Sequence, residues 1–295
     1  MDQSDDRRYT AAKYVSRRTA LRASGIAVAT MLAGCSQSDA QETPDTTQSP
    51  DQGSDLIDDI RFDAQDLVVE LTAGHDVSTV NLIAPDGTLY AEESVSSDVS
   101  TLHIKIIEVD PGLGRYQHYT PGEYELHLDH GNSSENVPIK LSPDIQISSI
   151  EQAQSKDRSN LGQIEVTVEN TGTAPTWVHD ISFSDSPNFA ADGDIKENPG
   201  IIPFGSDSIE ELIVPPKSTQ TYTSPTAPLV FQETARSGCE GTSVEFTVKI
   251  GIATQDVISQ QLIATPSGEQ IRRSLSDEFT CTAAEIQQAG PSGGD

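Results

Sequence analysis

Three cysteines and six histidines are the residues of this 295-residue chain that most readily carry chemistry. None of them stands in a catalytic spacing: the chain contains no nucleophile elbow, HExxH, Walker-type loop, CxxC or Ser-x-x-Lys. His127 and His130 are three residues apart, which on a strand places their side chains on opposite faces. We therefore expect exposed or half-buried surface histidines, no enzymatic activity, no metal site and no cofactor.

An acidic stretch offers the one set of oxygen ligands for a hard cation. Residues 192–198 read DGDIKEN, but they lack both the spacing of an EF-hand and its late bidentate Glu. We expect a solvated acidic loop here, with bound calcium as the alternative.

Residues 111–122 concentrate recognition chemistry in a chain that is only 5% aromatic. They include Arg115, Tyr116, His118 and Tyr119. Tyrosine and arginine are favoured contact residues, and long loops at the ends of β-sandwiches often bind partners. One hypothesis is therefore a binding loop for an anionic partner. The alternative is that both tyrosines are buried and cover the end of the first predicted domain.

The first 34 residues have the features of an export signal. An apolar run at 23–33 is shorter than the roughly 20 residues that span a bilayer, and it has the proportions of a signal-peptide core. Just before it, Arg17, Arg18 and Leu21 resemble the twin-arginine export motif. Just after it, Cys35 ends the sequence LAGC, which resembles a lipobox, where the cysteine is lipidated and becomes the mature N-terminus.

Cleavage before Cys35 would leave a strongly acidic chain. The segment removed holds six of the 18 basic residues and three of the 46 acidic ones, so the net charge changes from −28 to −31. This balance argues against nucleic-acid binding, and it keeps a surface hydrated in concentrated salt. Together with the export signal, it resembles a haloarchaeal surface lipoprotein. The resemblance implies export of the folded chain, a lipid anchor on the extracellular face of the cell membrane, and an envelope protein or polysaccharide as a possible partner.

The remaining cysteines, Cys239 and Cys281, are an even pair outside the membrane, which usually becomes a disulfide. Two free thiols or two metal ligands are the alternatives. No histidine lies within four residues of either cysteine, which makes a poor zinc site.

The mature chain divides by composition. Residues 35–55 are polar and rich in Pro and Gly, which predicts a disordered linker. From Leu56 onward, short alternating apolar runs are bounded by turn residues about every 8 to 12 positions, the pattern of a sandwich. The predicted fold is all-β, with two tandem immunoglobulin-like β-sandwiches of about seven strands each. Their predicted limits are 56–142 and 143–285, with a disordered tail at 286–295.

The second predicted domain resembles the CARDB type of immunoglobulin-like domain, a cell-adhesion-related domain found in bacteria. The resemblance covers about 145–265 and rests on the hairpin sequence VTVENTGTAP at 166–175 and on IVPPKSTQ at 213–220. The segment 184–210 is long for that family. This resemblance implies architecture and supplies no reaction.

Two further residues are notable. Asn132 begins the one N-x-[ST] sequon, within a predicted hairpin turn where a glycan would be tolerated. Trp177 opens a predicted strand, and we expect it in a core or between the domains. The sequence as a whole predicts a membrane-anchored, non-enzymatic binding or structural module of the cell envelope. An accessory subunit of an envelope transport or secretion complex is the alternative.

Overall fold

The computed structural model describes most of the chain from residue 54 onward. The described residues are 54–110, 115–154, 160–195, 209–233, 238–241, 243–273 and 277–289. The predicted signal, nearly all of the predicted linker and residues 290–295 lie outside them. Among the described residues, no helix is long and apolar enough to cross a membrane.

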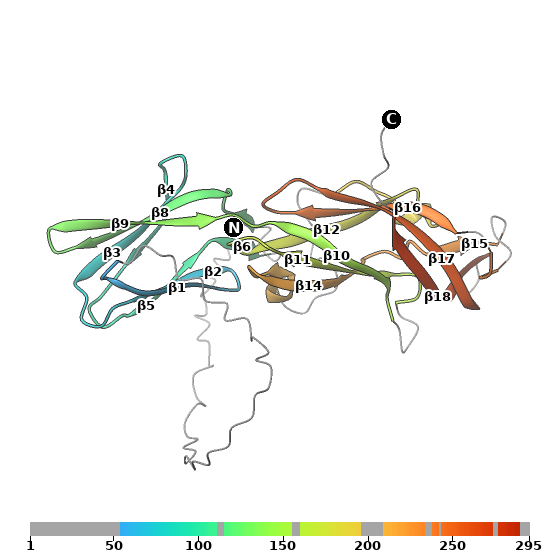
Figure 1. Cartoon of the computed structure of the whole chain (residues 1–295), viewed down its shortest axis with the longest axis horizontal. Coiled ribbons are helices and arrows are strands. Elements are labelled where there is room, and N and C mark those ends of the chain that lie inside the picture. The colour runs from blue at the N-terminus through green and yellow to red at the C-terminus, as the bar shows by residue number, and fades with distance from the viewer. Residues whose placement is uncertain are drawn as a thin grey trace, which may run out of the picture. The chain divides into compact units, whose positions relative to one another are not determined.

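The first sandwich consists of a three-stranded and a four-stranded antiparallel sheet (Figure 1). The smaller sheet has the order β1-β2-β5, with β1 at Ile57–Asp63, β2 at Asp66–Leu71 and β5 at Thr101–Lys105. The larger has the order β4-β3-β8-β9, with β3 at Val77–Ile83, β4 at Leu89–Ser94, β8 at Gly122–His130 and β9 at Ser133–Leu141.

Strand β8 illustrates why these sequences form a sandwich. Tyr124, Leu126 and Leu128 are buried, whereas Glu123 and Glu125 between them are exposed. This period of two places every apolar side chain on the inner face of the sheet. A two-residue turn, in which Gly131 has φ of 54°, then pairs β8 with β9.

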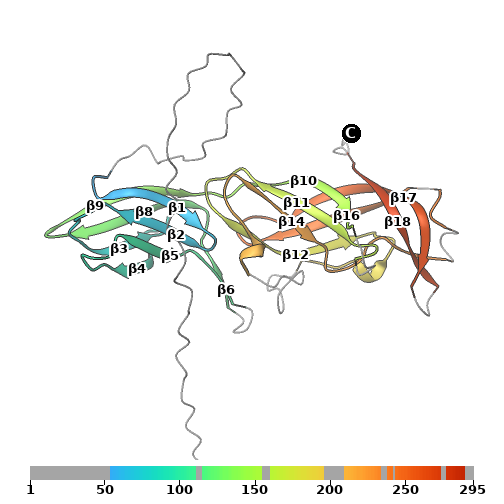
Figure 2. The same ribbon diagram turned by 90° about the horizontal axis from the view of Figure 1, so that it is seen from below.

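Within the predicted long loop at 111–122, residues 115–118 instead form one strand of a hairpin. Strand β6 (Ile107–Asp110) pairs with β7 (Arg115–His118) in a separate two-stranded sheet. Figure 2 shows β6 diverging from the sheets of the first sandwich. The Pro and Gly residues at 111–114 suggested an irregular connection, but they lie between two short pairing strands.

The second sandwich also has two antiparallel sheets. The smaller has the order β10-β11-β14, with β10 at Ile145–Gln152, β11 at Ile164–Asn170 and β14 at Ser218–Thr223. The larger has the order β13-β12-β16-β17-β18-β15, with β12 at Thr176–Ser184, β13 at Ile213–Val214, β15 at Val230–Gln232, β16 at Val244–Ile252, β17 at Ile258–Arg272 and β18 at Glu278–Gln288. Two short 3-10 helices, η1 (Phe189–Ala191) and η3 (Ile209–Leu212), complete the described elements.

These sheets confirm the predicted all-β sandwich class. Buried apolar residues of both sandwiches form one continuous cluster. The predicted tail begins too early, because β18 continues to Gln288, which pairs with Leu262 of β17. The alternating polar and apolar residues at the end of β18 allow this edge of the sheet to extend beyond the core.

Candidate functional site

The segment between β9 and β10 brings the two sandwiches together, and the contacts around it form the most elaborate polar and aromatic cluster in the described chain. Only Ser142, Pro143 and Asp144 separate the two strands. So short a connection places the end of the first sandwich directly against the start of the second. The geometry of this junction therefore depends on the side chains that meet there.

Tyr119 crosses the junction from the first sandwich. Its side chain is fully buried, and its hydroxyl donates a hydrogen bond of 2.6 Å to the carbonyl of Pro175. Burial raises the pKa of Tyr119, because the phenolate could not be solvated there. As a correction to the binding-loop hypothesis, Tyr119 is not available to a partner, since it is enclosed in the core.

Tyr116 makes the second aromatic contact across the junction. Its ring stacks on Trp177 with centroids 5.9 Å apart and planes inclined by only 5°. Trp177 is 2% exposed and also packs against His179, with ring centroids 5.8 Å apart. The expectation of Trp177 in a core or between domains is thus confirmed. Stacked aromatic pairs of this kind contribute roughly 0.5–1.5 kcal/mol beyond the area they bury.

The other residues of the predicted binding loop lie at the edge of this cluster. His118 is exposed, and its Nδ1 lies 3.0 Å from the carbonyl of Tyr119. Arg115 begins β7 opposite Asp110. Tyr116 and Tyr119 are used in packing, whereas His118 lies at the surface, so these three residues do not form one binding surface.

Asn170 fastens the connecting segment from the side of the second sandwich. It is fully buried, and its side-chain oxygen accepts from the N–H groups of Asp144 and Gly172. Its side-chain nitrogen donates to the carbonyls of Ala174 and Val214. All four hydrogen bonds go to backbone groups, so this amide ties four points of the chain together.

The turn that follows Asn170 lies directly on the connecting segment. The Thr173 hydroxyl donates to the carbonyl of Lys140 at 2.8 Å, and the Thr171 hydroxyl donates to the carboxylate of Asp144 at 2.7 Å. A Cβ at Gly172 would lie 2.3 Å from the carbonyl oxygen of Ser142. Glycine is required because the two backbones approach too closely for a side chain.

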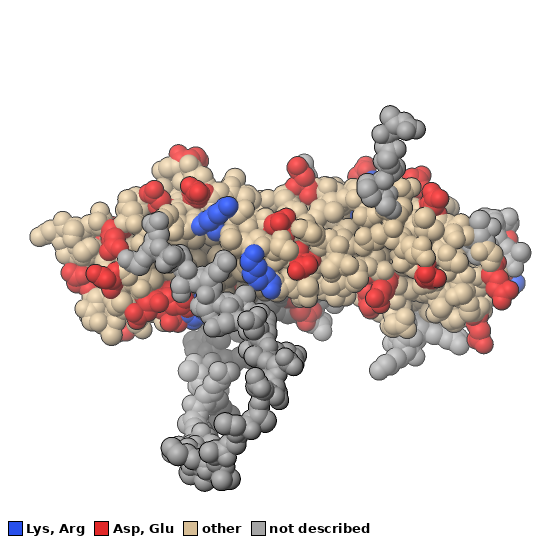
Figure 3. Space-filling model, viewed as in Figure 1, with Lys and Arg blue, Asp and Glu red and all other residues tan. Residues whose placement is uncertain are grey.

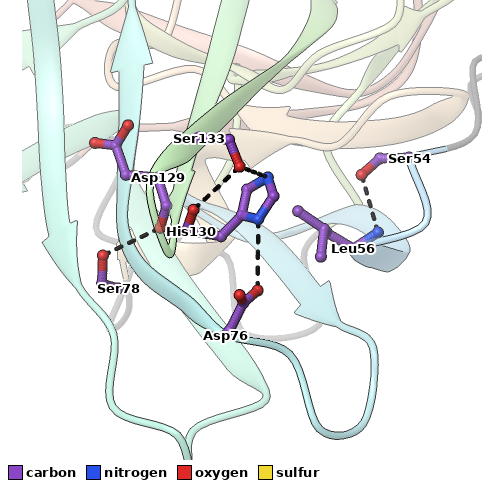
Figure 4. Close-up of polar contacts among 7 residues, drawn as sticks. All are labelled: Ser54, Leu56, Asp76, Ser78, Asp129, His130 and Ser133. Carbon is purple, nitrogen blue, oxygen red and sulfur yellow. Dashed lines mark hydrogen bonds and ion pairs between the residues drawn. The ribbon is translucent and has the colours of Figure 1, made fainter.

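A second cluster occupies the opposite end of the first sandwich (Figure 4). Asp76 Oδ1 lies 3.5 Å from His130 Nδ1, and His130 Nε2 lies 3.4 Å from Ser133 Oγ. The order of these groups is that of a hydrolytic triad. Both distances exceed the roughly 2.6–3.2 Å of a proton-transfer contact, and Ser133 Oγ also donates to the His130 carbonyl at 3.3 Å. The cluster connects the β8–β9 turn to the β2–β3 loop.

Sequence reasoning did not find this cluster. The hairpin turn was predicted at residues 129–132, with His130 inside it, whereas the structure has a two-residue turn that makes His130 and Ser133 direct cross-strand partners. Asp76 lies 54 positions earlier, and no local signal joins it to them.

Asn132 lies at the tip of the same turn and is exposed. The acidic loop at 192–198 is described only as far as residue 195. There, the backbone N–H of Gly193 donates to Phe183, and Asp192 accepts from the backbone N–H of Ser186. Among the described residues, no three His, Cys, Asp or Glu side chains come close enough to hold a metal ion. The lipidation site Cys35 and the export residues Arg17, Arg18 and Leu21 lie outside the described residues.

Cys239 and Cys281 form a disulfide, with Cα atoms 5.5 Å apart. Both cysteines are buried, and Cys281 lies within β18. The bond therefore attaches the segment that precedes β16 to β18, which lies between β17 and β15 in the larger sheet. It closes a separation of 42 residues and supports the predicted pairing.

Carboxylates are scattered over the visible face of the molecule, where lysine and arginine side chains are few (Figure 3). Several of the described cations are already paired: Arg61 with Asp59 and Glu70, and Arg272 with Glu233. A surface of this kind repels polyanions, in agreement with the composition.

No protein-family model matches this chain, and no curated protein matches it. A solved structure named "Biofilm associated protein - BSP domain" is similar at 14% identity and a TM-score of 0.22, over 67% of this chain and 27% of that one. The chain thus spans about a quarter of the length of that structure. The CARDB and lipoprotein resemblances stay predictions.

Proposed function

We propose that this protein is a lipid-anchored extracellular module of the cell envelope that acts as a non-enzymatic spacer. Its second sandwich would be held away from the membrane surface by the first. The observation that carries the proposal is the junction, where a buried tyrosine, an aromatic stack and a fully bonded asparagine hold two sandwiches in one arrangement. A spacer requires a fixed connection of this kind, whereas independent modules joined by a long linker do not.

The direction of the chain supports this role. The predicted tether leads into Leu56, whose carbonyl accepts from the N–H of Thr72, and the β2–β3 loop that follows reaches the β8–β9 turn. The chain enters the second sandwich from the other end of β9, through residues 142–144. The nine residues of β9 span about 30 Å at roughly 3.3 Å each. Tether and second sandwich therefore attach at opposite ends of the first sandwich.

The surface charge supports an extracellular, high-salt setting. The predicted mature charge of −31 would generate strong self-repulsion in dilute buffer, since the Debye length is about 10 Å at 0.1 M salt. At about 1 M salt the Debye length falls to about 3 Å, and the repulsion between neighbouring carboxylates is screened.

Fractionation of the native organism's cells tests the anchor. We expect the wild-type protein in the membrane fraction and Cys35→Ser released or misprocessed, while Ser36→Ala, the neighbouring control, stays in the membrane. Replacing Arg17 and Arg18 with lysine should stop export. Membrane retention of a normally processed Cys35→Ser protein would overturn the lipid anchor.

A pull-down from gently solubilised membranes separates the spacer from the alternative role. Stoichiometric recovery of transport or secretion components would favour an accessory subunit. Recovery of the protein alone, or with cell-surface polymers, would favour a structural module.

A further inference from the structure

We propose that Asn132 carries an N-linked glycan. The inference rests on the proposed extracellular location, because the modification belongs to exported proteins. In the reaction, Nδ2 of Asn132 attacks the anomeric carbon of an activated sugar phosphate donor. A carbon–nitrogen bond forms, the carbon–oxygen bond to phosphate breaks with its electron pair, and the nitrogen loses one proton.

The β8–β9 turn presents the sequon in an accessible form. Asn132 and Ser134 are both exposed, and among the described residues neither side chain has a hydrogen-bond partner. Asn132 lies in the turn itself, whereas Ser134 is the second residue of β9. The amide that would be modified and the hydroxyl that completes the sequon are therefore both at the surface of the folded chain.

The intervening residue is occupied elsewhere. Ser133 faces His130 on the opposite side of the hairpin, and His130 in turn contacts Asp76 (Figure 4). These contacts hold the base of the turn without using the Asn132 side chain. A glycan could thus be attached to the folded chain without breaking any contact between described side chains.

The position of the turn gives the modification a consequence. The β8–β9 turn lies at the end of the first sandwich where the predicted tether enters, as the contacts of Leu56 with Thr72 and of Asp76 with His130 show. A bulky, hydrated glycan there would occupy the space between the first sandwich and the membrane. It would supplement the acidic surface as a barrier to close approach.

Mass spectrometry of the protein purified from its own membranes tests the proposal. Trypsin should release residues 116–140 as one peptide, and we expect this peptide to carry an added glycan mass. Asn132→Gln and Ser134→Ala should lose the added mass. Ser134→Thr should keep it, because threonine also completes the sequon, and Ser133→Ala should keep it because the middle position is not read.

Outcomes of this experiment separate the glycan from the anchor. An unmodified 116–140 peptide in protein that is processed and membrane-bound would overturn the glycan alone. Unprocessed protein in the cytosol would overturn both proposals. Persistence of the added mass in Asn132→Gln would place the modification on another residue and refute the assignment.

Discussion

Replacing Tyr119 with phenylalanine tests whether the two sandwiches unfold as one unit. The substitution removes only the hydroxyl, which donates 2.6 Å to the Pro175 carbonyl inside the core. The carbonyl loses this donor in a place that water does not reach. Leaving a buried polar group without its partner costs about 1–3 kcal/mol, so we expect the free energy of unfolding to fall by that amount.

Tyr90→Phe is the matched control. The Tyr90 hydroxyl donates 2.8 Å to the Ile106 carbonyl, and both residues belong to the first sandwich. This substitution should lower stability comparably but leave the connection between the sandwiches intact. Only Tyr119→Phe removes a bond that crosses the junction.

Urea titration in molar salt, followed by circular dichroism, distinguishes the two effects. The wild type and Tyr90→Phe should each unfold in one transition. The unfolding transition of Tyr119→Phe should broaden or split, because two units that unfold separately each expose less surface and have smaller m-values. A Tyr119→Phe protein with unchanged midpoint and unchanged m-value would refute the idea that this bond couples the sandwiches.

Three further predictions concern other parts of the fold. Gly172→Ala should lower the thermal midpoint markedly, because its Cβ would meet backbone atoms at 2.3–2.5 Å. The control Gly193→Ala should change the midpoint little, because its Cβ would meet only a serine hydroxyl at 3.1 Å. Equal midpoints of the two variants would contradict the close packing at the junction. Replacing Cys239 and Cys281 with serine should lower the free energy of unfolding by about 4 kcal/mol in the chain-entropy model. Urea titration against the oxidised protein measures this loss. An unchanged free energy of unfolding would show that the bond does not constrain the unfolded chain. Burial raises the pKa of Tyr90 to about 12, above the unfolded value of about 10, so folding favours the neutral phenol. This contribution to stability is complete below pH 10 and is lost as the pH rises toward 12. Urea titrations across about pH 9–12 should detect the loss, and a flat profile would contradict it.

Local periodicity was sufficient to predict the sheets. Buried residues alternate with exposed or half-buried ones along the first part of β8, and a turn signal at 129–132 follows, so both strand and hairpin could be predicted. The same reasoning placed the start of the disordered tail too early, at residue 286. Residues 286–288 have few apolar neighbours in sequence, yet they pair with β17 through backbone bonds that composition does not reveal.

Contacts between distant segments could not be predicted in this way. Tyr116 and Trp177 are 61 positions apart, and each was notable only as an aromatic residue in a chain with few. Sequence reasoning left Tyr119 open between recognition and packing because both uses favour tyrosine. The deciding quantity is burial, which depends on where Pro175 lies in the folded chain.

The motif behind the resemblance to a known domain type acquires a physical role at the junction. The Asn170–Gly172 pair was interpreted as a hairpin signal, and this prediction is wrong, because the turn connects β11 to β12, which lie in different sheets. Its asparagine, however, bonds the linker N–H of Asp144, and its glycine is the point where the linker backbone passes most closely. The second sandwich of this protein therefore carries its own attachment point for the first sandwich. The stiffness proposed for the spacer would then reside in a few residues of the second sandwich and not in the composition of the linker.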